Sequence, residues 1–237
     1  MIQKGLLKPL FFVLFLCILH PAQGQLFKKK AKKKPPTEKS ASKKDIQPYE
    51  KVITKKAKSD DGLFTVHDVD GKFFYEIPDS LFNREMLMVS RISKTASGIG
   101  FGGVKINTHV LRWEKKPKKV LLRVVSYNNV AADSLPIHEA VVNSNFEPIL
   151  YAFKIKAFNK KDSLNPATVI QIDPMFLKDV NALGMPERYR KRFKVSRLDE
   201  ARGYVESIKS YPLNIEARHV KTYLAKSPPS NGTLGSI

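Results

Sequence analysis

The sequence contains only one cysteine, Cys17, among its 237 residues. One thiol cannot form a disulfide within the chain, so the fold has to be held by the packing of apolar side chains. The chain is long enough, and at 42% apolar residues rich enough, to bury a hydrophobic core in one medium domain or two small ones. The composition therefore predicts a globular protein without cross-links.

Long apolar runs are also scarce. The run from Leu10 to Leu19 is about half the 18–20 residues that a membrane-spanning helix needs. Lys4 and Lys8 precede it, and Ala22-Gln23-Gly24 offers small residues at the positions that a signal peptidase reads. We therefore expect residues 1–24 to be a signal peptide, removed together with Cys17. The protein is expected to be exported to the periplasm, the outer membrane or the outside of the cell.

Negative charge is scarce in the first quarter of the chain. Residues 1–60 hold 15 Lys and Arg against 4 Asp and Glu, a net +11, whereas residues 61–237 hold 27 against 18, a net +9. Residues 25–47 are dense in lysine and almost without apolar side chains, which predicts a disordered linker. This linker either contacts an anionic surface or is a solvated spacer. The lysines that would make such a contact are Lys28, Lys29, Lys30, Lys32, Lys33 and Lys34.

The histidines do not form a metal motif. His138 and Glu139 begin like the zinc-protease signature H-E-x-x-H, but Val142 stands where the second histidine is required. His67, His109 and His219 are scattered singly in β-rich runs and are expected to be ordinary strand residues. We therefore assign no catalytic, metal-binding or cofactor-binding residue in this chain.

Two further patterns suggest binding sites but favour simpler structures. Residues 98–103 satisfy G-x-G-x-x-G, yet the alternating strand pattern that follows them favours a connecting loop over a dinucleotide site. Residues 188–194 mix cations with aromatics, as nucleic-acid grooves do. The alternative is a turn of helix begun by Pro186, with Tyr189 and Phe193 buried four residues apart. We favour the helix, and export argues against a nucleic-acid partner.

The remaining pattern is mainly that of β-strands. Residues 63–69 and 72–77 flank Asp70-Gly71, which predicts a tight hairpin. Further strands are expected at residues 86–92, 104–110, 120–126, 149–158, 168–172 and 213–218.

A helix is expected at residues 196–208. Ser196 and Asp199 resemble a capping box there, and Pro212 ends the run. The apolar stripe of this helix would comprise Leu198, Ala201, Val205 and Ile208. The predicted fold class is α+β, a mainly antiparallel sheet with a few short helices.

Three blocks carry a resemblance to a known family: "PYEKVITKKAKSDDGLFTVHDVDGKFFYEIPDSLFNREMLMVSRIS" (residues 48–93), "AVVNSNFEPILYAFKI" (140–155) and "SYPLNIEARHVKTY" (210–223). The chain resembles the N-terminal part of large exported zinc-dependent metalloproteases of Gram-negative bacteria. In these proteins two domains of unknown function precede a metzincin-like catalytic domain.

The resemblance implies a small first domain at residues 48–95 and a second at 103–237 that is truncated at its C-terminus. It places zinc and the catalytic motif in the downstream domain, and Ala140 and Val141 in a block that supplies packing.

Two functions remain open. The leading hypothesis is a non-catalytic accessory region of an exported zinc metallopeptidase, with a folding, packing or latency role and the catalytic domain as its partner in cis. The alternative is a stand-alone β-rich binding module of the cell envelope, held to an anionic surface by the lysine-rich segment. The first predicts no peptidase activity and no tight zinc binding for this chain alone. The second predicts salt-sensitive binding to anionic vesicles.

Overall fold

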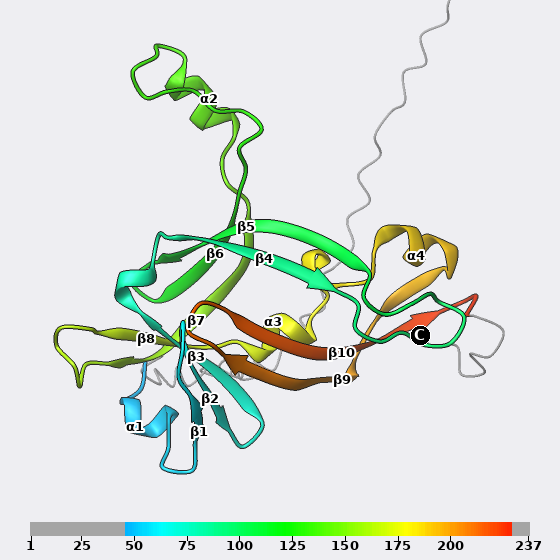
Figure 1. Ribbon diagram of the computed structural model, residues 1–237, viewed down its shortest axis with the longest axis horizontal. Coiled ribbons are helices and arrows are strands. Elements are labelled where there is room, and N and C mark those ends of the chain that lie inside the picture. The colour runs from blue at the N-terminus through cyan, green and yellow to red at the C-terminus, as the bar shows by residue number, and fades with distance from the viewer. Residues whose placement is uncertain (1–45, 229–237) are drawn as a thin grey trace, which may run out of the picture. The chain divides into compact units, whose positions relative to one another are not determined.

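The computed structural model describes residues 46–228, so the predicted signal peptide and nearly all of the lysine-rich linker lie outside the described residues. The fold is mainly antiparallel β-sheet with a few short helices, as the sequence predicts (Figure 1). The strands are β1 (Lys58–Asp60), β2 (Thr65–Val69), β3 (Lys72–Pro78), β4 (Glu85–Arg91), β5 (Lys105–Lys115), β6 (Lys119–Val125), β7 (Ile149–Asn159), β8 (Ala167–Gln171), β9 (Val195–Ser210) and β10 (Ile215–Ala225). The helices are α1 (Tyr49–Val52), α2 (His138–Ser144), α3 (Asp173–Leu177) and α4 (Glu187–Arg192), with 3-10 turns η1 (Asp79–Leu81) and η2 (Asn181–Leu183). Within residues 46–228, no helix is long and apolar enough to span a membrane.

The hairpin predicted at Asp70-Gly71 is confirmed. Asp70 has φ 51° and Gly71 has φ 78°, the positive values that a tight two-residue turn requires. The turn sets the register of β2 against β3, in which His67 lies opposite Phe74. The expected strands at residues 86–92, 120–126, 149–158 and 168–172 are also found within a few residues of their predicted ends. The one expected at 104–110 is longer, because β5 continues to Lys115 against β6.

Eight strands form one sheet in the order β1-β2-β3-β8-β7-β6-β5-β4. β3 pairs with β2 on one side and with β8 on the other, and β4 pairs with β5 at the far end of the sheet. The predicted first segment, residues 48–95, therefore supplies strands at both ends of this sheet, and strands β5 to β8 of the second segment lie between them. The remaining strands, β9 and β10, form a separate two-stranded ribbon.

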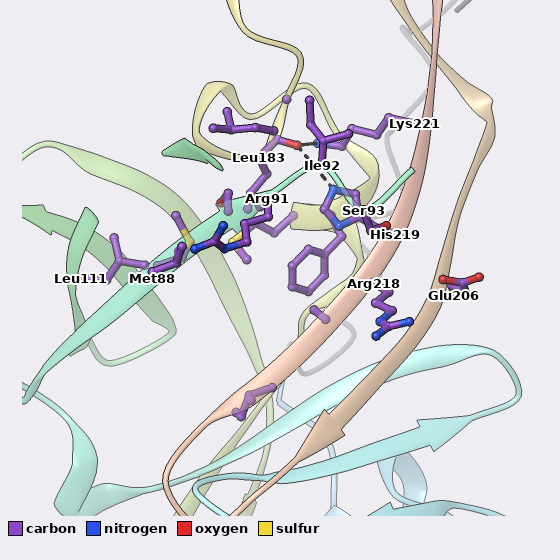
Figure 2. Close-up of a pocket in the computed structure, with 18 of the residues that line it drawn as sticks. Met88, Arg91, Ile92, Ser93, Leu111, Leu183, Glu206, Arg218, His219 and Lys221 are labelled. Carbon is purple, nitrogen blue, oxygen red and sulfur yellow. Dashed lines mark hydrogen bonds between the residues drawn. The ribbon is translucent and has the colours of Figure 1, made fainter. Parts of the chain in front are cut away.

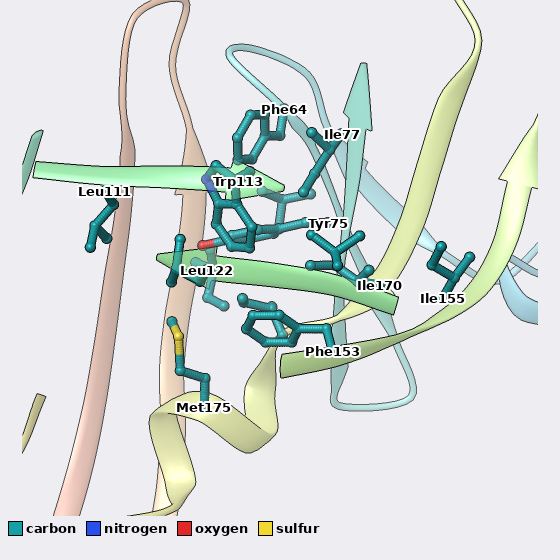
Figure 3. Packing of buried hydrophobic residues seen from close by; sticks show 14 of the residues in the cluster. Phe64, Tyr75, Ile77, Leu111, Trp113, Leu122, Phe153, Ile155, Ile170 and Met175 are labelled. Atoms are coloured by element: carbon teal, nitrogen blue, oxygen red, sulfur yellow. The ribbon is translucent and has the colours of Figure 1, made fainter. Parts of the chain in front are cut away.

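The core joins side chains from both segments (Figure 3). Trp113 of β5 is 6% exposed, and its ring centroid lies 5.9 Å from that of Phe64 and 5.6 Å from that of Phe153. Ile77 of β3 and Ile170 of β8 are fully buried beside this aromatic group. Because aromatic and branched side chains from distant strands share one interior, we expect the described region to unfold as a unit.

The helix expected at residues 196–208 is wrong, because this segment is the long strand β9. Ser196 does not cap a helix but donates a hydrogen bond from its hydroxyl to the carbonyl of Leu224 on β10, at 3.1 Å. The register of β9 and β10 shifts between the pairs Arg218–Ser207 and His219–Val205. Such a bulge changes which residues face inward, so Val205 and Ile208 both reach the core despite their spacing of three. The helix-like spacing of these apolar residues is therefore produced by a bulged strand.

The far end of the ribbon is fastened to the sheet beside β1 and β2. The amide of Ser210 donates to a carboxylate oxygen of Asp60 at 2.9 Å, and its hydroxyl donates to the carbonyl of Phe64 at 2.6 Å. Gly62 passes so close to this joint that a Cβ there would lie 2.5 Å from the hydroxyl of Ser210. The ribbon is thus fixed to the sheet at this end.

Candidate docking groove and exposed arm

An open cavity of about 1090 Å³ lies between β4 and β10 (Figure 2). Consecutive residues line it on both sides, from Arg84 to Ala96 and from Ala217 to Tyr223. Since alternate residues of a strand point to opposite faces, an unbroken run of lining residues means that the edge of each strand borders the cavity. Apolar side chains such as Met88, Leu111 and Phe176 form its floor. We refer to this cavity as the groove. Its size and apolar lining are those of a binding site, into which a few polar groups converge.

The carbonyl of Leu183 organises the polar wall of the groove. It accepts hydrogen bonds from His219 Nε2 at 3.4 Å and from Lys221 Nζ at 3.2 Å (Figure 2). With its proton on Nε2, the imidazole presents a bare Nδ1, and this buried atom has no hydrogen-bond partner among residues 46–228. The buried hydroxyl of Ser90, on β4, also has no partner in that range. Both residues line the groove, although these two atoms are buried beneath its surface.

Burial shifts the titration of both side chains on β10. It lowers the pKa of His219 to about 4, and the positive charge of Lys221 adds to that effect. Burial likewise lowers the pKa of Lys221 to about 8, although the carboxylate of Asp179 opposes the shift. At neutral pH the groove therefore contains a neutral imidazole beside a largely protonated amine.

One end of the groove is held rigid by a network around Arg190 of α4. Its guanidinium makes a two-pronged ion pair with Asp179, at 2.6 and 2.8 Å, and its Nε donates to the carbonyl of Met185 at 2.8 Å. It also lies over the ring of Tyr223, 5.0 Å from the centroid. The hydrogen bonds from Arg190 lower the pKa of Asp179, so the pair stays ionised.

The connection between β6 and β7, residues 126–148, projects from the sheet as an arm that carries α2 (Figure 1). Six of the fourteen large apolar residues that are exposed in the described chain lie on it: Tyr127 (58%), Val130 (68%), Leu135 (50%), Ile137 (60%), Val142 (51%) and Phe146 (73%). The arm holds no Lys or Arg and three acidic residues, in a chain of net charge +20. It is therefore both the most apolar exposed segment and locally acidic. The expected packing role of Ala140 is not found, because this residue is exposed.

Hydrogen bonds at its base and within it keep the arm in shape. Arg123 donates to the carbonyl of Glu147 at 2.8 Å and lies over the ring of Phe146, 4.8 Å from the centroid. Asn129 donates to the side chain of Asn145 at 2.8 Å, and His138 Nδ1 is bonded to the carbonyl of Ala131 at 3.0 Å. His138 thus binds its own arm and stabilises the turn before α2.

A second cluster of side chains lies under α1. Ser59 Oγ is 2.7 Å from His67 Nδ1, and His67 Nε2 is 3.0 Å from the carboxylate of Glu76. This carboxylate also accepts hydrogen bonds from Tyr49, at 2.7 Å, and from Asn159, at 2.6 Å. Burial alone would raise the pKa of Glu76, but these three hydrogen bonds outweigh it and lower the pKa.

The order of serine, histidine and carboxylate is that of a hydrolase triad. Here, however, Ser59 and His67 are simply cross-strand neighbours of β1 and β2, and Glu76 links α1 and β7 to the hairpin. We interpret the cluster as a structural network.

The remaining sequence predictions can be located. The glycine-rich residues 98–103 form a connecting loop, as expected, and Ile99 is buried against Phe193. The helix after Pro186 is confirmed as α4, in which the rings of Tyr189 and Phe193 stack with centroids 6.4 Å apart. Lys28, Lys29, Lys30, Lys32, Lys33 and Lys34 lie outside the described residues. Within residues 46–228, no three His, Cys, Asp or Glu side chains gather as metal ligands do.

The fold and the groove define a class: an antiparallel β-sheet protein with an open, apolar, strand-edged cavity. Comparison with known families shows to which family the chain belongs. The family described as domain of unknown function DUF5118 matches residues 46–95, and that described as domain of unknown function DUF5117 matches residues 103–236. The second match covers more than half of the chain, which therefore belongs to the DUF5117 family. No curated protein and no solved structure matches the chain. Two domains of unknown function are thus found, as the resemblance implied.

Proposed function

We propose that this chain is a non-catalytic docking module, the accessory region of an exported zinc-dependent metallopeptidase, and that it binds the catalytic domain through the arm. The observation that carries the proposal is the concentration of exposed apolar side chains on residues 126–148. Monomeric proteins rarely expose such apolar clusters unless they form an interaction site. The link to a peptidase rests on the sequence resemblance of residues 48–93, 140–155 and 210–223.

The arm is suited to docking in two ways. Its apolar side chains are presented on a short helix and its flanking turns, which are braced by hydrogen bonds and so lose little conformational entropy on binding. Glu147 is ion-paired with Arg112, and the two other carboxylates of the arm, Asp133 and Glu139, favour a partner surface that is apolar and rimmed by basic residues.

The test uses the full chain and the separately produced zinc domain of a family member that carries the same two segments upstream. Val142→Asp places a charge in the centre of the arm, and Leu164→Asp makes the same change at a residue that is 89% exposed outside it. We expect titration calorimetry to show binding for the parent chain and for Leu164→Asp. Binding by Val142→Asp should be weaker by about tenfold or more, because an interface charge without a partner is costly to bury.

Three outcomes would count against the proposal: no complex, equal affinity of the two variants, or zinc-dependent casein cleavage by the chain alone. The alternative, a module tethered to an anionic envelope surface, predicts salt-sensitive binding to anionic vesicles that disappears when residues 25–47 are deleted. If the chain binds the zinc domain through the arm and does not bind vesicles, the result supports the docking module over the envelope tether.

A further inference from the structure

The groove has two strand edges that lack a partner strand in the described part of the chain. β4 is the last strand of the eight-stranded sheet, and β10 pairs only with β9. Both edges border the same cavity, since consecutive residues of each strand line it. Exposed strand edges present rows of unpaired amide and carbonyl groups, which form a template for another strand.

β4 lacks the features by which proteins usually block such an edge. Residues 86–90 read Met-Leu-Met-Val-Ser, with no charge and no proline, and the charges Glu85 and Arg91 lie only at the ends of the strand. Leu87 is 68% exposed and Val89 45% exposed on one face, while Met86 and Met88 line the groove on the other. An edge strand with apolar side chains on both faces is suited to pairing and poorly suited to solvent.

The two edges are oriented so that one added strand can pair with either. β4 and β10 run in the same direction in Figure 1. A strand inserted between them with the opposite direction would therefore be antiparallel to both. At about 3.3 Å per residue, the seven residues of β4 span about 23 Å. This length accommodates a segment of about five to seven residues.

The charges around the groove select the chemistry of the occupant. Its lining holds five cations, Arg84, Arg91, Lys94, Arg218 and Lys221, against two carboxylates, Glu85 and Glu206, a net +3. Both carboxylates are already engaged, Glu206 by Lys94 at 3.6 Å and Glu85 by the hydroxyl of Tyr127. The free charge of the groove is therefore positive, above an apolar floor.

We propose that the groove binds an extended, acidic polypeptide segment, which adds as a strand to the free edge of β4 and places apolar side chains at alternate positions on the methionine-lined floor. The carboxylates of the segment contact Arg218 and Lys221. This recognition combines main-chain pairing for affinity with alternating pockets and charge for selection. It is independent of the arm and of its partner.

The experiment measures binding of a fluorescent seven-residue peptide, acetyl-Glu-Val-Thr-Val-Ser-Val-Glu-amide, to the full chain by anisotropy. One control peptide is N-methylated at alternate residues, which removes the donors that a strand needs. A second control replaces both Glu by Lys. We expect N-methylation to weaken binding by about tenfold or more, because several main-chain hydrogen bonds are lost.

Arg218→Glu tests the charge preference, with Arg197→Glu on the same ribbon, outside the groove lining, as the matched control. We expect Arg218→Glu to lower the preference for the Glu peptide over the Lys peptide by at least about threefold, and Arg197→Glu to leave it unchanged. Hydrogen exchange of residues 86–90 should slow in the presence of the Glu peptide. This readout does not depend on the folding of any variant.

If the N-methylated peptide bound as tightly as the unmodified one, the proposal would be overturned. That result is expected if the peptide only contacts the lysine-rich segment at residues 28–44 through its charges, without pairing as a strand. Unchanged exchange of residues 86–90 would also overturn the proposal. If the peptide fails to bind while dodecanoate displaces a fluorescent fatty acid from the chain, the groove is a site for anionic amphiphiles and the proposal is wrong.

Discussion

Replacing Ile77 by alanine tests whether residues 46–95 and 103–236 share one core. Ile77 lies on β3, in the first segment, and is fully buried. Because β3 pairs with β8 of the second segment and Ile77 joins the cluster around Trp113, the loss of its side chain leaves a cavity between the segments. Isoleucine-to-alanine changes in cores cost about 2–5 kcal/mol. In a protein of this size that lowers the melting temperature by about 4–20 °C.

The single tryptophan of the chain makes the assay specific. Trp113 belongs to the second segment, so its fluorescence reports unfolding there, while circular dichroism reports all of the strands. We expect one transition, shifted equally in both signals, for Ile77→Ala. Ile137→Ala is the matched control, since Ile137 is 60% exposed on the arm and its replacement should cost less than about 0.5 kcal/mol. An unchanged fluorescence transition beside a shifted one in circular dichroism would show that the segments fold separately, and would refute the shared core.

Three further predictions follow from single residues. His219 is neutral in the folded protein, with a pKa of about 4 against 6.5 when unfolded, so its contribution to stability is complete above pH 6.5 and is lost as the pH falls towards 4. His219→Phe, which keeps the ring contact with Phe176, should remove about 3 kcal/mol of this pH dependence in urea titrations, whereas His138→Phe should preserve it. Glu76 has a lowered pKa, so its stabilisation is present above the usual pKa of a glutamate and is lost as the pH falls through the lowered value. Glu76→Gln should therefore destabilise the fold by about 1–3 kcal/mol at pH 7 and by less once the pH has fallen through the lowered pKa, and a loss that does not change with pH would contradict this role. Gly62→Ala should cost about 1–3 kcal/mol in thermal melts, because its Cβ would lie 2.6 Å from the carbonyl oxygen of Tyr211. Gly71→Ala is not an equivalent control, since Gly71 has φ 78° and its replacement would strain the backbone.

The parts of the fold that depend on local sequence could be predicted. Asp70-Gly71 determined a hairpin, and from its register one could have placed His67 and Glu76 on the same face, two positions apart across the strands. The same reasoning applied to β10 would have placed His219 and Lys221 together, since residues two apart in a strand share a face. The spacing of metal ligands, by contrast, has no bearing on where a hydrogen-bonded imidazole lies.

The groove could not be predicted from the sequence. It exists only because β4 ends the sheet and β10 ends the ribbon, and these strands are more than one hundred residues apart in the chain. The sequence of β9 predicts a helix because a bulge brings Val205 and Ile208 to the same side of the strand at helical spacing. The exposure of the arm was equally hidden, because its apolar residues resemble those of a packed segment until the course of β6 and β7 is known.

Hydrogen exchange of the full chain, measured with and without the zinc domain of a family member that carries the same segments, tests the proposed docking function most directly. The account predicts slower exchange in residues 126–148 on addition of the zinc domain, and no slowing there when the chain carries Val142→Asp. Unchanged exchange of the arm, at concentrations of the zinc domain that saturate any complex, would contradict it.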